Sequence, residues 1–123
     1  MAYPPSHVHV LSRSGAATPA GAPPERVIAG SGAAKVWNAF SDPSGRFHAG
    51  HWQGEPGRLA VSYTETELCV ILVGRVRLTD ERGSTADFGP GDAFVIASGF
   101  RGTWESIGRV TKIYAVLEPE PPA

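Results

Sequence analysis

The chain has few cysteines and no excess of positive charge. Cys69 is the only cysteine among 123 residues. A single cysteine excludes an intramolecular disulfide, so the sequence carries no sign of an oxidising compartment. Lysine and arginine together number 11 against 12 acidic residues, which gives a formal net charge of -1. Without a positive field to attract them, nucleic acids are not expected as partners.

Long apolar segments are also missing. No apolar run reaches the roughly 18–20 residues that a membrane-spanning helix requires. Residues 1–15, MAYPPSHVHVLSRSG, have neither a basic start nor the apolar core of about 7–15 residues found in secretory signals. We therefore expect a cytoplasmic protein with no membrane partner. Cys69 lies in the apolar run 68–73, where we expect a buried thiol that packs as a small hydrophobic residue.

Glycine and proline are plentiful, with 15 and 11 residues. They gather in turn-like stretches at 41–45, 54–57 and 80–83, and apolar and polar residues alternate between these stretches. About ten short strands are expected, and no convincing helical pattern follows residue 25. Hydrophobic residues make up 41% of the chain, enough for one packed core. The pattern predicts one all-β domain, either a sandwich or a barrel.

Three parts are predicted along the chain. Residues 1–25 form an extended or flexible N-terminal arm, because 14–24 read SGAATPAGAPP. Within the arm, residues 6–11 alternate like a short strand that could pair with a sheet edge, on this barrel or on a neighbour's. Residues 26–118 form the barrel, and residues 119–123 form a loose tail.

Two segments resemble the sequence motifs of a known family. In the first, Glu67 precedes an apolar strand that ends at Gly74; in the second, residues 89–100 read GPGDAFVIASGF. Together they resemble the two motifs of cupins. Residues 26–118 are similar to the small single-domain cupins of the ureidoglycine aminohydrolase cupin domain and EutQ-like group, in the RmlC-like cupin superfamily. The resemblance implies an all-β cupin barrel, a double-stranded β-helix of the jelly-roll type.

Metal-binding cupins hold a divalent transition metal with three histidines and one glutamate, and this chain departs from that pattern. Glu67 matches the glutamate, but the histidine of the second motif falls on Gly102. The first-motif histidines fall, depending on loop length, on Ala60 and Ser62 or on Val61 and Tyr63. One carboxylate cannot hold such a metal tightly. We predict a barrel with no cofactor or with weak metal binding; the alternative is one divalent transition metal on Glu67 and His51.

Strand periodicity gathers polar side chains inside the predicted barrel. If Glu67 points inward, and Lys112 and Tyr114 do so too, they form a polar cluster with Tyr63. A Lys–Glu pair there could serve acid/base chemistry or be a structural salt bridge. An indole at Trp104 could stack on a planar ligand or pack in the core. The candidate catalytic residues are Glu67, Tyr63 and Lys112, and the candidate ligand-binding residues are Trp104, Tyr114, His51 and Trp52.

These residues leave functions of different kinds open. The favoured one is a cupin-domain protein that binds an unidentified small molecule in the barrel. The alternative is a small-molecule enzyme, a hydrolase or isomerase with or without a metal, which uses Glu67 as acid/base while Tyr63 and Lys112 orient the substrate. A third option is a barrel that serves mainly as an assembly module. The outward apolar residues of the segment 68–73 need a cover, so we expect a homodimer.

Overall fold

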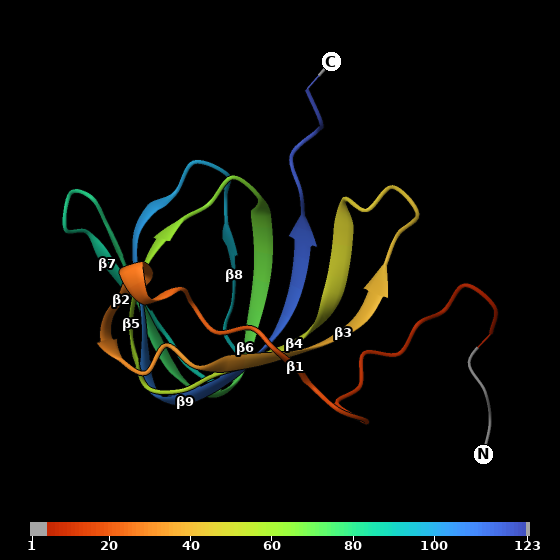
Figure 1. Cartoon of the computed structure of the whole chain (residues 1–123), viewed down its shortest axis with the longest axis horizontal. Coiled ribbons are helices and arrows are strands. Elements are labelled where there is room, and N and C mark those ends of the chain that lie inside the picture. The colour runs from red at the N-terminus through yellow and green to blue at the C-terminus, as the bar shows by residue number, and fades with distance from the viewer. Residues whose placement is uncertain (1–4, 123) are drawn as a thin grey trace.

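A computed structural model describes residues 5–122, which form nine β-strands and one short 3-10 helix (Figure 1). The elements are β1 (Thr18–Pro19), η1 (Pro24–Arg26), β2 (Val27–Gly30), β3 (Ala34–Ser41), β4 (Phe47–Gly54), β5 (Gly57–Ser62), β6 (Thr66–Asp80), β7 (Thr85–Phe88), β8 (Ala93–Ile96) and β9 (Arg101–Leu117). The prediction of an all-β chain is confirmed. Within residues 5–122, no helix has the length and apolar character needed to cross a bilayer.

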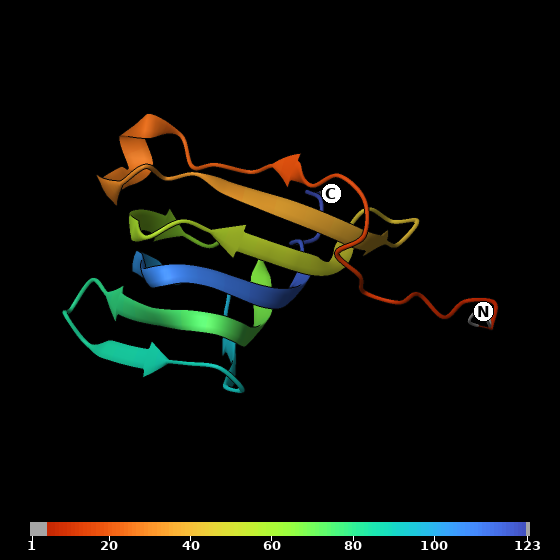
Figure 2. The same ribbon diagram turned by 90° about the horizontal axis from the view of Figure 1, so that it is seen from below.

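Two long strands, β6 and β9, organise the sheet. They pair with each other antiparallel, from Thr66 opposite Leu117 to Asp80 opposite Gly102. The first half of β9 also pairs with β5 and its second half with β4, while β7 and β8 pair with the other edge of β6. One layer is therefore β3-β4-β9-β6-β8 and the other is β2-β5-β9-β6-β7. The sheet curls into a half-barrel with these layers facing each other (Figure 1, Figure 2).

The sheet turns its corner where both long strands bend. Gly74 in β6 has a φ of 85°, and a Cβ there would lie 2.3 Å from the carbonyl oxygen of Arg109 in β9. The pairing register shifts on both sides of Val73, which marks a bulge. The roughly ten short strands expected from the sequence include two separate pairs, one at 68–73 and 75–79 and the other at 103–107 and 110–117. The structure joins each pair into one bent strand, because β6 and β9 resume their pairing beyond the bend.

The hydrophobic core lies between the two layers. Its buried members come from β6, β8 and β9: Cys69, Ile71, Val76, Leu78, Ile96, Trp104 and Val110. Phe88 and Phe94 stack with ring centroids 3.9 Å apart where β7 and β8 meet this cluster. Successive residues of a strand point to opposite faces. The alternation that buries Cys69 and Val110 therefore also turns Glu67 and Lys112 inward.

The N-terminal region pairs with the sheet through residues other than the predicted 6–11. Residues 6–11 form no strand, and the short β1 pairs with β3 instead, with Thr18 opposite Val36. The ring of His9 lies 4.6 Å from the ring of Phe40, also in β3. Residues 1–4 of the predicted arm lie outside the described residues.

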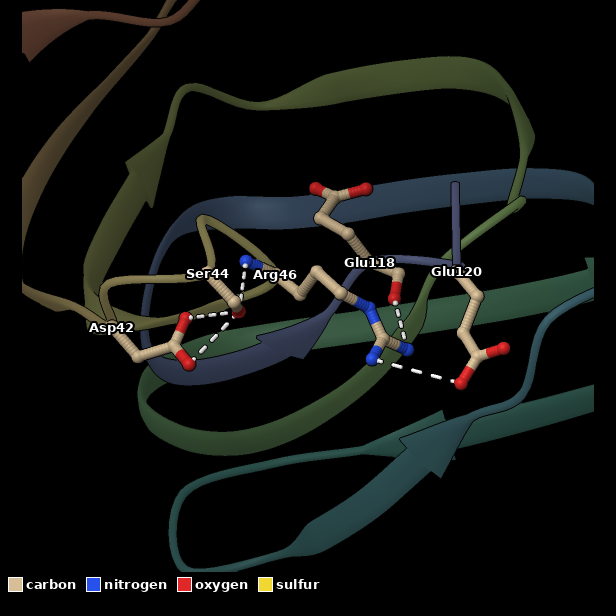
Figure 3. A network of polar contacts seen from close by, with 5 residues as sticks. All are labelled: Asp42, Ser44, Arg46, Glu118 and Glu120. Carbon is tan, nitrogen blue, oxygen red and sulfur yellow. Dashed lines mark hydrogen bonds and ion pairs between the residues drawn. The ribbon is translucent and has the colours of Figure 1, made fainter. Parts of the chain in front are cut away.

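After β9 the chain returns to the turn between β3 and β4 (Figure 3). The Glu118 N–H donates to the carbonyl oxygen of Arg46, and Arg46 Nη2 donates to the carbonyl oxygen of Glu118 at 3.3 Å. Arg46 also lies 3.9 Å from the carboxylate of Glu120. Ser44 Oγ donates to both carboxylate oxygens of Asp42 at 2.9 Å, which stabilises the same turn. Residue 123 of the predicted tail lies outside the described residues.

Candidate functional site

A cavity of about 500 Å³ opens between the two layers. Residues of β3, β4, β5, β6 and β9, together with the segment between β5 and β6, line it. Most of the predicted site residues are brought together in its wall: Trp52, Tyr63, Glu67, Trp104, Lys112 and Tyr114. Aliphatic side chains, those of Val36, Leu59, Val61 and Val116, also line it. The cavity therefore combines an apolar lining with a small number of polar groups, as ligand-binding cavities commonly do.

A buried ion pair forms the polar centre of this cavity. Lys112 Nζ on β9 lies 2.6 Å from Glu67 Oε2 on β6, and the two residues are only 5% and 7% exposed. Burial alone lowers the pKa of Lys112, but the interactions with Glu67 and then Cys69 together outweigh it and raise that pKa. The lysine therefore remains an ammonium ion and can donate hydrogen bonds, but it cannot act as a base at neutral pH.

Two indoles enclose the same ammonium. Lys112 Nζ lies 4.2 Å from the ring centroid of Trp104 and 4.9 Å from that of Trp52. The two indoles meet edge to face at an interplanar angle of 79°. Trp104 Nε1 donates to Ser106 Oγ at 3.0 Å, and the ring belongs to the buried core. Trp104 thus packs in the core and also lines the cavity, and its stacking on a planar ligand stays a prediction.

Cys69 lies beside the ion pair and is fully buried. Its Sγ is 3.4 Å from Glu67 Oε2 and 3.6 Å from Lys112 Nζ. Burial raises the pKa of the thiol to about 12, despite the nearby ammonium of Lys112. A thiol with this pKa is not a nucleophile at neutral pH. The expectation of a buried thiol that packs as a small hydrophobic residue is confirmed.

Two phenols complete the polar lining. Burial, and after it the charge of Glu67, raises the pKa of both Tyr63 and Tyr114. Both phenols therefore keep their protons and are available as hydrogen-bond donors. The Tyr114 hydroxyl donates to Asn38 Oδ1 at 2.6 Å. Glu67 is thus surrounded by groups that hold their protons and can donate hydrogen bonds.

His51 is not part of the cavity. It lies on β4 one residue before Trp52, which lines the cavity, so its side chain points to the opposite face of the sheet. It is 6% exposed, and its Nδ1 has no hydrogen-bond partner among residues 5–122. Burial, and then the charge of Arg13, lowers the pKa of the imidazole. The structure therefore does not bring His51 and Glu67 together.

The residues around Glu67 do not fit the transition metal of metal-binding cupins. Among residues 5–122, no cluster of three or more His, Cys, Asp or Glu side chains could hold a metal ion. The Lys112 ammonium, 2.6 Å from Glu67, would repel a second cation at this carboxylate. At Gly102, the position of the second-motif histidine, a Cβ would lie 1.9 Å from the carbonyl oxygen of Thr79. No side chain could occupy that position without moving the backbone.

Sequence reasoning missed several polar residues of the cavity wall: Asn38, His48, Glu65 and Glu118. Strand alternation could have predicted His48, because it places this residue on the same face as Trp52 and on the face opposite His51. Its ring is held by a contact of 2.7 Å between Nδ1 and Ser41 Oγ. The two glutamates lie just outside strands, where no periodic pattern indicates the direction of a side chain.

Two facing layers around long bent strands, with a cavity at the motif glutamate, define a cupin barrel. The predicted fold class is confirmed. Within this class, the sequence model of the EutQ-like cupin domain matches residues 41–114, so the chain belongs to the EutQ-like cupin domain family.

Solved structures place the chain among proteins of similar fold. A protein of unknown function in the DUF861 family, from Pseudomonas syringae pv. tomato str. DC3000, is 31% identical with a TM-score of 0.75 over 86% of this chain. The EutQ protein of Clostridium difficile is 13% identical with a TM-score of 0.63 over 72% of this chain. The match spans 46% of the first protein and 64% of the second. No curated protein sequence matches the chain.

Proposed function

We propose that this cupin domain binds a small organic molecule, neutral or cationic, in the cavity above the Lys112–Glu67 pair. The observation that carries the proposal is the cavity of about 500 Å³, in which that buried pair lies among aromatic and aliphatic side chains. Such a wall can cover the flat or apolar body of a ligand, and the polar groups can orient it. The volume suits a small molecule rather than a polymer. The solitary buried cysteine supports a cytoplasmic location, which is part of the proposal.

The charge of the cavity wall supports the choice of ligand. Three carboxylates line it, those of Glu65, Glu67 and Glu118, against the single ammonium of Lys112. Within residues 5–122, neither Glu65 nor Glu118 forms an ion pair. Figure 3 shows the carboxylate of Glu118 turned away from Arg46, whose guanidinium binds the Glu118 carbonyl oxygen instead. The excess negative charge would repel an anionic ligand.

Three flat probes of nearly the same shape test this proposal: benzamide is neutral, benzamidine is cationic and benzoate is anionic. We expect calorimetry and tryptophan fluorescence to detect binding of benzamidine and benzamide. Benzoate should bind at least about tenfold more weakly, the factor given by about 1.4 kcal/mol of repulsion. Trp52→Leu should weaken binding, whereas Trp37→Leu, outside the cavity wall, should not. If none of the probes binds, or if Trp52→Leu leaves their affinities unchanged, the proposal is wrong.

A second candidate is an enzyme that uses Glu67 as acid/base. It is favoured by the position of Glu67 in the cavity wall beside Tyr63 and Lys112, which keep their protons and can orient a substrate. The ureidoglycine aminohydrolase reaction depends on metal ligands that this chain lacks at the matching positions. A hydrolysis or isomerisation here would therefore depend on Glu67. Incubation with benzamide should release ammonia, and Glu67→Gln should abolish the release, if this candidate is correct.

We further propose that the chain forms a homodimer through the outer face of the layer that contains β8. Leu68 and Leu72 on β6 are 41% and 36% exposed, and Val95, opposite Leu68 on β8, is 60% exposed. Val70 pairs with Ile113 on β9 and extends the same apolar face. A second copy would cover this face with an identical one. Light scattering at micromolar concentration should give a dimer, and Leu68→Lys should give a monomer. A wild-type monomer would refute the proposal.

A further inference from the structure

A chain of hydrogen bonds connects the interior of the barrel to a histidine of the cavity wall. The Tyr114 hydroxyl on β9 donates to Asn38 Oδ1 at 2.6 Å. Asn38 Nδ2 on β3 donates to Ser41 Oγ at 2.9 Å, and Ser41 Oγ lies 2.7 Å from Nδ1 of His48 on β4. Strand register brings these residues together, because Ser41 stands opposite His48 and Gly50 stands opposite both Asn38 and Tyr114.

Gly50 leaves the space that the first of these bonds needs. A Cβ at this position would lie 2.8 Å from the Tyr114 hydroxyl and 2.2 Å from the carbonyl oxygen of Trp37. Any other residue would push the phenol away from Asn38 or open the β3–β4 pairing. The glycine therefore allows the phenol to reach across β4 to the side chain of Asn38.

The direction of donation along this series of hydrogen bonds follows from the donors and acceptors available. Tyr114 keeps its proton, because burial and the charge of Glu67 raise its pKa, and it donates that proton to the amide oxygen of Asn38. The amide nitrogen of Asn38, which can only donate, then points to Ser41. Ser41 Oγ accepts this bond and has its own proton to donate. Among residues 5–122, the acceptor within reach of that hydroxyl is Nδ1 of His48.

We propose that Asn38 and Ser41 are positioning residues that hold His48 with its proton on Nε2, so that His48 donates a hydrogen bond to an oxygen atom of the ligand. His48 belongs to the cavity wall, and its Nδ1 is already bound to Ser41. Its Nε2–H is therefore the ring group that remains available to a ligand in the cavity. This inference rests on the proposed function. It narrows the ligand to a molecule with an oxygen acceptor, and the carboxylates of the wall disfavour an anion. The class is a neutral carbonyl compound such as an amide.

The position of the proton is tested without any ligand. Nitrogen-15 NMR of the full-length protein at neutral pH distinguishes a bare Nδ1 from a protonated one. The wild type should show His48 with Nδ1 bare and Nε2 protonated, and His48→Gln identifies its signals among the four histidines. A proton on Nδ1 of His48 in the wild type would overturn the inference, whatever the protein binds.

A substitution of equal size at Asn38 should reverse the direction of the hydrogen bonds from Asn38 through Ser41 to His48. In Asn38→Asp the new side chain can only accept, so the Ser41 hydroxyl must donate to it, and Ser41 Oγ must accept from His48 Nδ1. The proton of His48 should therefore move to Nδ1. Lys35→Gln is the control, because it changes the net charge by the same amount from the opposite face of β3 and should leave the proton on Nε2. If Asn38→Asp leaves the proton on Nε2, Asn38 does not position His48.

Probe affinity then tests the contact with the ligand. Asn38→Asp should lower the affinity for benzamide by about fivefold, which corresponds to the loss of one hydrogen bond, because His48 no longer donates to the carbonyl oxygen. Benzamidine has no oxygen to accept that bond, so its affinity should not fall. Equal losses for both probes would overturn the contact with His48. Failure of both probes to bind the wild type would instead contradict the proposed function, and the NMR result would still decide the position of the proton.

Discussion

Two ion pairs of nearly equal length lie in very different surroundings. Lys112 Nζ and Glu67 Oε2 are 2.6 Å apart inside the barrel, with side chains 6% and 9% exposed. Arg109 Nε and Glu55 Oε2 are 2.9 Å apart on the outside, with side chains 60% and 36% exposed. Distance alone does not separate these pairs. The pairs differ in their exposure to solvent, because water screens the outer pair and solvates either partner that is left alone.

The inner pair behaves as a unit for the same reason. Each charge lost its hydration on folding, and each now depends on the other and on the surrounding indoles and thiol. Removing both charges together can therefore cost little, whereas removing one leaves a buried charge without compensation. The comparison of the inner and outer pairs leads to four predictions.

The largest effect should come from removing one inner partner. Glu67→Gln should lower the free energy of unfolding by about 3–5 kcal/mol, because it leaves the Lys112 ammonium buried without its carboxylate. Urea denaturation measures this loss. The double variant Glu67→Gln with Lys112→Met should recover most of it, since no buried charge remains. If the double variant is as unstable as the single one, the cost comes from packing and not from charge.

Alkaline pH should also act on the inner cluster. Cys69 has its pKa raised from 9.0 to about 12 by burial, so the unfolded thiol ionises at lower pH than the folded one. The pKa of Lys112 is likewise raised from 10.5, so its contribution is present below that pH and is lost as pH rises through the folded pKa. The free energy of unfolding should therefore fall from about pH 9 upward, by at most about 1.4 kcal/mol per pH unit for each such group.

Cys69→Ala identifies the first part of this alkaline loss. Compared with its own stability at pH 7, the variant should show a flatter decline between pH 9 and 10, because its unfolded state has no thiol to ionise. Denaturation curves at several pH values measure the difference. A decline as steep as that of the wild type would show that another group is responsible.

The outer pairs should contribute little. Arg109→Ala, and separately Arg77→Ala, which breaks the exposed 2.8 Å pair with Asp87, should each lower the free energy of unfolding by about 0–1 kcal/mol. Added salt should reduce even this difference, whereas it should not remove the effect of Glu67→Gln. A loss of several kcal/mol at Arg109 would break the distinction between the inner and outer pairs.

The smallest expected effect concerns metal. Because the ammonium of Lys112 already neutralises Glu67, elemental analysis of the untagged protein should find manganese, iron, nickel and zinc at background. Glu67→Ala should give the same result. Near-stoichiometric metal that disappears in Glu67→Ala would contradict our interpretation and would require ligands that the described residues do not bring together.

The sequence alone determined the class of fold and one wall of the site. Turn residues and alternating strands predicted an all-β barrel, and the motif around Glu67 predicted its type. Alternation also relates neighbouring residues reliably, since it requires only the period of two in a strand. It correctly joined Glu67 with Cys69, and Lys112 with Tyr114, but it did not determine which of the two faces of each strand points inward.

Tertiary structure decided everything that depends on pairing between distant strands. Lys112 meets Glu67, and Tyr114 reaches Asn38, only because β9 pairs with both β6 and β4. Alternation predicted that His48 and His51 point to opposite faces of β4. The curl of the sheet determined that His48 is the one in the cavity wall. The amino-acid sequence shows which residues of a strand share a face. Hydrogen bonds between strands that lie far apart in the sequence determine which of these faces enclose the cavity.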